Sequence, residues 1–219
     1  FTGSVATGRK VAAATAPNFV RCQLEMGSKN ALVIADDADL QVAIDAAVAG
    51  AFGGSGQKCT ASSRLIVMDG IHDAFVEGVV AKMKTLKVGH ALDDGIFMGP
   101  IVDDKQLASN MEWIDKAKQL GANLAFGGER LEMPHDGYYM SPTLFTETDN
   151  SWAINQEEVF APLACVMRVN SLEEAIAMTN DTRFGLTGGI ITQSLRSSAM
   201  FKEQVQAGCV MVNLATAGT

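Results

Sequence analysis

Residues 31–68 read ALVIADDADLQVAIDAAVAGAFGGSGQKCTASSRLIVM, and their pattern predicts the fold class. Apolar runs at 31–35 and 65–68 have the length and composition of buried strands. Between them, apolar residues recur at helical spacing from Leu40 to Val48, after an Asp39 suited to an N-cap and before a glycine-rich break at 53–56. The order strand, helix, strand predicts an α/β fold with a largely parallel sheet flanked by helices.

The same alternation continues along most of the chain. Helical spacing predicts helices over residues 5–16, 73–86, 103–120, 172–179 and 195–205. Apolar or alternating runs predict further strands over residues 19–24, 165–169, 189–192 and 209–213. Residues 127–151 are rich in Gly, Pro, Asp and Asn, so we expect loops over the surface or at a sheet edge.

Length and charge restrict the function classes. At roughly 150 residues per domain, the 219 residues suit one large domain or one domain with part of another. The 17 Lys and Arg against 25 Asp and Glu give a net charge of −8. Since the basic residues form no cluster longer than a pair, we expect no nucleic-acid surface. No apolar run approaches the roughly 20 residues of a membrane-spanning helix, so we expect no membrane partner.

The first residues and the cysteines bear on whether the chain is part of a longer protein and on its redox environment. The chain opens at Phe1 rather than at Met, and we expect it to be a segment of a longer protein. Its four cysteines show neither paired metal-ligand spacing nor the density of a secreted disulfide scaffold. We therefore expect a reducing, cytoplasmic setting. The three histidines also lack ligand spacing, and we predict no metal site.

Cys59 differs from the other three cysteines. Cys22, Cys165 and Cys209 lie in apolar, strand-like runs, where a thiol usually acts as a small buried hydrophobe. Cys59 instead follows a glycine-rich turn, and Lys58 and Arg64 are nearby. Nearby cations favour the reactive thiolate. From the residues alone, a nucleophile and a structural thiol are equally good interpretations.

Two further segments carry candidate chemistry. Glu25 ends an apolar run, and its carboxylate could stand in a cleft as a general base; a solvated glutamate at a strand end is the simpler interpretation. Gly3 and Gly8 surround a predicted helix N-terminus, where free backbone N–H groups favour a phosphate. The spacing matches neither common dinucleotide nor P-loop patterns, so on its own it indicates little.

Four segments together resemble the aldehyde dehydrogenase family, in the family's order along the chain. FTGS (1–4) looks like the turn that binds the cofactor pyrophosphate, LEMGSKN (24–30) like the general-base motif, and GQKC (56–59) like the nucleophile loop. QEEVFAPL (156–163) is similar to the segment that holds the nicotinamide ribose. Ser28 and Ala161 depart from the pattern, since glycine is usual at both positions. Both replacements are small and remove no functional group.

The resemblance implies the remaining assignments. It implies that residues 1–30 end a dinucleotide-binding domain, that residues 31–219 form a catalytic domain truncated at both ends, and that the full-length protein is a homo-oligomer. Cys59 would attack an aldehyde and Glu25 would activate water, with NAD or NADP as cofactor. The implied cofactor positions are Gly3, Ser4, Gly8, Met26, Gly27, Glu158 and Phe160. The sequence around Cys59 most resembles that of bacterial 2-oxoglutarate semialdehyde (2,5-dioxopentanoate) dehydrogenases.

Other interpretations remain open at this level. Cys59 could pair with a histidine in a cysteine hydrolase, or the chain could be an isolated catalytic segment without activity. A substrate carboxylate would require a cation at the pocket mouth. Arg64 is one candidate for that cation, although a structural role is the simpler interpretation.

Overall fold

A seven-stranded sheet forms the centre of the molecule in the computed structural model, which describes residues 1–217. The strand order is β11-β10-β3-β4-β9-β8-β5, and every neighbouring pair is parallel except β5 with β8. The strands are β3 (Asn30–Ile34), β4 (Ser62–Met68), β5 (Asn123–Phe126), β8 (Thr143–Thr146), β9 (Leu163–Val169), β10 (Thr187–Ile191) and β11 (Cys209–Val212). The predicted α/β fold with a largely parallel sheet is therefore confirmed.

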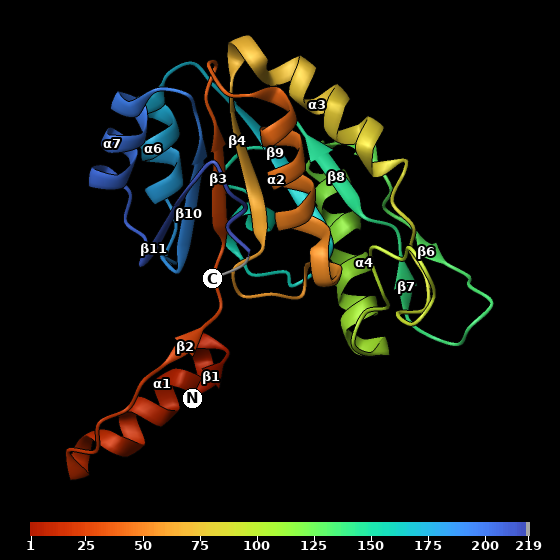
Figure 1. The fold of residues 1–219 in the computed structure, drawn as a ribbon. Helices are drawn as coiled ribbons and strands as arrows, with labels where there is room; N and C mark the ends of the chain where they lie inside the picture. The colour runs from red at the N-terminus through yellow and green to blue at the C-terminus, as the bar shows by residue number, and fades with distance from the viewer. Residues whose placement is uncertain (218–219) are drawn as a thin grey trace.

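Helices cover both faces of this sheet (Figure 1). One face packs against α2 (Leu40–Phe52) and α3 (Asp69–Met83). The other face packs against α4 (Asp104–Gln119), α5 (Ala153–Gln156), α6 (Leu172–Asn180) and α7 (Leu195–Gln204). Parallel strands that are buried on both faces read as continuous apolar runs, which is the pattern seen at residues 31–35.

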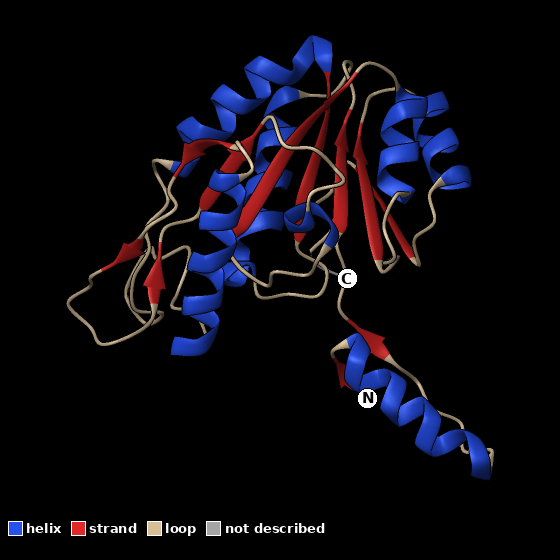
Figure 2. Cartoon of the chain, turned by 180° about the vertical axis from the view of Figure 1, so that it is seen from behind, coloured by secondary structure: helices blue, strands red, loops and turns tan. Residues whose placement is uncertain are grey.

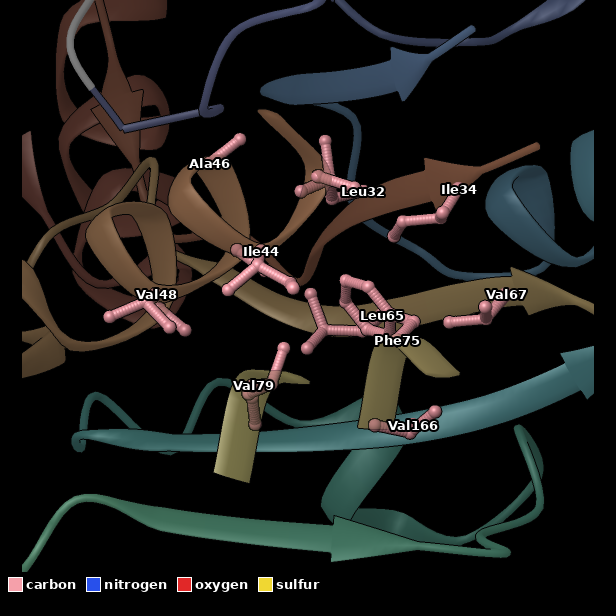
Figure 3. Packing of buried hydrophobic residues seen from close by; sticks show 14 of the residues in the cluster. Leu32, Ile34, Ile44, Ala46, Val48, Leu65, Val67, Phe75, Val79 and Val166 are labelled. Atoms are coloured by element: carbon pink, nitrogen blue, oxygen red, sulfur yellow. The ribbon is translucent and has the colours of Figure 1, made fainter. Parts of the chain in front are cut away.

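Alternate residues of each strand supply the two cores. Leu32 and Leu65 point towards α2 and α3, where they pack with Ile44, Phe75 and Val79 (Figure 3). Their neighbours along the strands, such as Val33 and Ile66, belong to the cluster beneath α6 and α7. Burying such a side chain contributes roughly 1.5–3 kcal/mol. The two cores fix the central strands from both sides, and they place the loops at the strand ends.

The first 26 residues form an arm that projects from the body of the molecule (Figures 1 and 2). Its elements are β1 (Thr2–Gly3), α1 (Val5–Thr15) and β2 (Glu25–Met26), and β1 pairs with β2 in parallel. The chain leaves the arm at Gly27 and enters β3 at Asn30. The turn of β1 and the strand β2 therefore lie where the arm meets the body.

The predicted helices are confirmed to within a few residues at their ends, but two expectations about the connecting segments are wrong. Residues 19–24 form no strand: Phe19 turns the chain with a φ of 53°, and the residues up to Leu24 run without regular structure. Residues 127–151 are not only loop, because they contain β6 (Arg130–Leu131), β7 (Tyr139–Met140) and the buried strand β8. β8 contributes the four residues TLFT, too few to show a period.

The cysteines also require a correction. Cys165 is buried in β9 as expected, but Cys22 and Cys209 are exposed. Cys22 lies in the irregular part of the arm, and Cys209 opens the edge strand β11, so neither is covered on two sides. Within residues 1–217, no helix is both long enough and apolar enough to cross a bilayer.

Candidate active site

Cys59 lies on a tight loop between α2 and β4. The loop starts with a 3-10 turn over Gly53–Gly56, in which Gly54 and Gly56 have φ values of 62° and 63°. The side-chain amide of Asn30 fixes the far end of the loop by donating to the carbonyl oxygens of Cys59 at 2.8 Å and Ala61 at 2.9 Å. Asn30 is buried at the start of β3, so the sheet itself positions the backbone of an exposed cysteine.

A pocket of about 630 Å³ opens beside this loop. It is lined by four segments that are distant in the sequence, and they include both Cys59 and Glu25. The lining residues are Thr2, Gly3, Ser4, Glu25, Met26, Gly27, Gln57, Lys58, Cys59, Thr60, Glu158 and Phe160. The structure therefore brings together every predicted site residue except Gly8.

Gly8 has a packing role instead. It is buried within α1, where a Cβ atom would come within 2.4 Å of the Met26 sulfur. The helix begins at the pocket, because Ser4 caps it by accepting from the Thr7 N–H group. An N-terminus of this kind offers backbone N–H groups and a partial positive charge to an anion.

Glu25 stands at the exposed side of the pocket. The sequence suggested that Glu25 ends a longer apolar strand. In the structure it belongs instead to the two-residue strand β2. One carboxylate oxygen accepts from the Gln23 side-chain amide at 3.0 Å. Solvent can reach the carboxylate, which is what a group that exchanges protons with water requires.

Glu158 and Phe160 also line the pocket. The Ser28 N–H group donates to Glu158 Oε1 at 3.1 Å, and the carboxylate lies directly against Gly27, where a Cβ atom would be 1.8 Å from Oε2. Burial raises the pKa of Glu158, while the Ser28 bond and the charge of Lys29 act in the opposite direction. Phe160 has a φ of 61°, a costly conformation for an aromatic residue, and its side chain is held partly exposed at the pocket.

Two buried cations lie behind the pocket, and neither was given a catalytic role by the sequence. The Arg64 guanidinium is used by the fold: Nε donates to the Lys29 carbonyl oxygen, and the other nitrogens donate to Asn150, Met178 and Thr179. Arg64 is 1% exposed and does not line the pocket, so the structural interpretation of this residue is confirmed. Lys29 is 2% exposed, and burial lowers its pKa to about 8.

Several lining residues were not given a site role from the sequence, namely Thr2, Gln57, Lys58 and Thr60. Thr2, Gln57 and Lys58 lie within the quoted motifs and Thr60 follows one of them, but their exposure to the pocket depends on loop geometry that spacing does not reveal. Gln57 also fixes the loop by accepting from the Val102 N–H group at 3.0 Å. The described residues that line the pocket include no histidine, which removes support for a cysteine hydrolase. Among residues 1–217, no group of three or more His, Cys, Asp or Glu side chains is arranged to hold a metal ion.

Comparison with known proteins shows to which family the chain belongs. The model of the aldehyde dehydrogenase family matches residues 1–219. The chain belongs to the aldehyde dehydrogenase family. Within this family it is similar to an alpha-ketoglutaric semialdehyde dehydrogenase of Bacillus subtilis (strain 168), with 40% identity over 100% of the chain and 45% of the relative.

Two further proteins are similar to this aldehyde dehydrogenase chain over its whole length. A 2,5-dioxopentanoate dehydrogenase of Saccharolobus solfataricus is 36% identical over 100% of the chain and 45% of its own length. The crystal structure of an NAD-dependent aldehyde dehydrogenase from Sinorhizobium meliloti superposes with a TM-score of 0.96 at 30% identity, covering 100% of the chain and 43% of that structure. The chain thus spans less than half the length of these relatives.

Proposed function

We propose that a full-length enzyme carrying this chain oxidises an aldehyde to a carboxylic acid, with NAD or NADP as the hydride acceptor. The observation that carries the proposal is the shared pocket of Cys59, Glu25 and Glu158. The proposed nucleophile Cys59, the proposed base Glu25 and the carboxylate of Glu158 line the same pocket, although they come from separate parts of the chain. Membership of the aldehyde dehydrogenase family supports the same reaction.

The pocket residues fit a nicotinamide dinucleotide. Glu158 has one oxygen held by Ser28, and a carboxylate in this position can accept from ribose hydroxyls. Phe160 offers an aromatic surface beside it, and the start of α1 at Ser4 suits a phosphate group. Met26 and Gly27 would line the same binding surface. When bound, the cofactor supplies a ring that accepts the hydride.

The chain's own groups account for the acyl-transfer steps. The Cys59 thiolate adds to the aldehyde carbonyl carbon and forms a thiohemiacetal, whose oxyanion the Cys59 backbone N–H group can stabilise. Loss of the hydride leaves a thioester on Cys59. Glu25 removes a proton from a water molecule that attacks this thioester, which releases the carboxylic acid and restores the thiol.

Two substitutions in the full-length enzyme test these roles. We expect Cys59→Ala to lower turnover by roughly a thousandfold or more, because no other group in the pocket can form the acyl intermediate. We expect Glu25→Gln to release a first burst of NAD(P)H and then to stall, because hydrolysis lacks its base. Stopped-flow absorbance measures the burst, and intact-protein mass spectrometry measures the acyl adduct on Cys59.

Two control variants test whether the expected effects are specific to Cys59 and Glu25. Cys22→Ala removes an exposed thiol outside the pocket, and Glu77→Gln removes an exposed carboxylate on α3; both should retain wild-type kinetics. An unchanged steady-state rate in Cys59→Ala or Glu25→Gln would refute the role of that residue.

The names of the relatives suggest the finer properties. We propose a semialdehyde with a distal carboxylate, such as 2,5-dioxopentanoate, as the substrate, since two of the similar proteins carry that specificity in their names. We further propose that residues 1–30 complete a dinucleotide-binding domain in a cytoplasmic homo-oligomer. A chain that lacks the rest of that domain should bind the cofactor weakly and show no turnover alone.

A further inference from the structure

Lys29 is a buried cation whose role the fold alone does not explain. It is 2% exposed and directly precedes β3. Arg64, the other buried cation, has its nitrogens bonded to carbonyl and amide oxygens. Among the described residues, by contrast, no carboxylate forms an ion pair with the Lys29 ammonium at direct contact distance. Keeping a buried charge without a direct counterion costs several kcal/mol, so such a residue usually serves a purpose.

A small cavity connects Lys29 with Glu158. Its volume is about 20 Å³, which is room for about one water molecule, and its wall includes Lys29, Glu158, Ser28 and a second, exposed cation, Lys58. The charged and titratable groups that act on Lys29 are Arg64, Cys165, Glu157 and Glu158. Of these, Glu158 shares the cavity with Lys29 and also lines the large pocket. Glu158 is therefore the carboxylate through which Lys29 can reach the proposed cofactor site.

Burial acts on both groups against their charged forms. It lowers the pKa of Lys29 to about 8 and raises the pKa of Glu158, while each charge offsets part of the effect on the other. Lys29 therefore remains largely protonated at neutral pH. The Ser28 N–H group holds one carboxylate oxygen of Glu158 at 3.1 Å, but a single neutral donor compensates only part of the desolvation of a half-buried carboxylate.

We propose that Lys29 is a positioning residue for Glu158: its ammonium group, acting through one bridging water in the shared cavity, keeps the Glu158 carboxylate ionised and fixed beside Gly27. The inference rests on the proposed function for its consequence, because an ionised and fixed carboxylate is what a pair of ribose hydroxyls requires. The electrostatic coupling itself exists with or without cofactor.

The coupling can be measured directly in the 219-residue chain. NMR of ¹³C-labelled glutamate carboxyl carbons and lysine ε-carbons follows the titration of each group, with Glu158→Gln and Lys29→Met identifying the two signals. We expect Lys29→Met to raise the titration midpoint of Glu158 by about one pH unit, and Lys29→Arg to preserve it. Because coupling is reciprocal, Glu158→Gln should lower the Lys29 midpoint by a similar amount.

Controls separate this inference from the proposed function. Lys116→Met removes an exposed lysine on α4 and should leave the Glu158 midpoint unchanged. The half-buried Glu158→Gln variant provides the reciprocal measurement if Lys29→Met does not fold. Midpoints indistinguishable from the wild-type values would overturn the inference, whatever the activity of Cys59 variants shows.

The consequence for the cofactor is tested in the full-length enzyme. We expect Lys29→Met to weaken NAD(P) binding about tenfold, with the loss largest at the lowest pH values, where Glu158 is ionised in wild type and protonated in the variant, and Lys29→Arg to restore it. Calorimetric dissociation constants across pH 6–9 measure this. A purely structural role would lower the melting temperature without changing the pH profile of binding, and that result would contradict a positioning role.

Discussion

At the scale of single residues, Lys29 makes the stability of the chain depend on pH. Its pKa is about 8 in the folded chain against an ordinary 10.5, so between these values the unfolded chain holds a proton that the folded chain has lost. Stability must then rise with pH across that window. A difference of this size corresponds to roughly 3 kcal/mol. In urea unfolding from pH 7.5 to 10.5, the unfolding free energy of wild type minus that of Lys29→Met should rise with pH.

The comparison between variants is needed because Cys165 acts in the opposite direction. Burial raises the pKa of this thiol from 9.0 to about 11, so the folded chain keeps a proton that the unfolded chain loses, and stability falls with pH above about 9. Subtracting the Lys29→Met curve from the wild-type curve removes the burial effect on Cys165, which both proteins share, and leaves the Lys29 contribution together with its charge interaction with Cys165. Lys116→Met should follow wild type, and an equal pH dependence in Lys29→Met would contradict the assignment.

At the scale of elements, the turn before Cys59 requires glycine at position 56. Gly56 has a φ of 63°, and a Cβ atom would lie 2.1 Å from the Ala161 carbonyl oxygen. Gly56→Ala therefore combines left-handed strain of roughly 1–2 kcal/mol with a clash against backbone that links the loop to the Glu158 segment. We expect a loss of roughly 2–5 kcal/mol in unfolding free energy, measured by urea denaturation.

Gly53 is the matched control in the same turn. Its φ is −58°, and no atom lies within 4 Å of a Cβ built on it. Gly53→Ala should therefore be neutral, or should stabilise the chain by roughly 0.4–1 kcal/mol through the unfolded state. Equal unfolding free energies for the two variants would show that the glycine-rich turn does not need its observed backbone geometry.

The elements also show where sequence reasoning succeeds. Runs such as residues 31–35 predict their strands because burial on both faces leaves a continuous apolar signal. Residues 19–24 alternate without becoming a strand, because Pro17 lies in the preceding 3-10 turn and Phe19 redirects the chain. The strand β8 is hidden because it is only four residues long, because it pairs with β5 and β9, and because its side chains are buried by helices on both faces of the sheet. Pairing partners of this kind are tertiary information.

At the scale of the whole molecule, the site exists only because the fold gathers distant segments. The sequence supplied Cys59, Glu25 and Glu158 through resemblance to known motifs, whereas the shared pocket required the sheet order β3-β4-β9 to place their loops at one edge. Buried supporting residues were harder to recognise. Three of them, Asn30, Lys29 and Arg64, lie behind the pocket. The sequence pattern alone does not show whether a polar residue in or beside an apolar run forms a structural hydrogen bond or belongs to a functional site.

The substrate proposal leads to a prediction for the full-length enzyme. Arg64 cannot meet a substrate carboxylate, because it is buried behind the site; Lys58 lines the pocket beside Cys59 and is the cation placed to do so. A charged contact of this type is worth roughly 1.5–3 kcal/mol. We expect kcat/KM for 2,5-dioxopentanoate to exceed that for pentanal by about tenfold or more, and Lys58→Met to reduce this ratio while pentanal oxidation persists. Equal kcat/KM values in the wild-type enzyme would reject the carboxylate-bearing substrate and leave the family assignment intact.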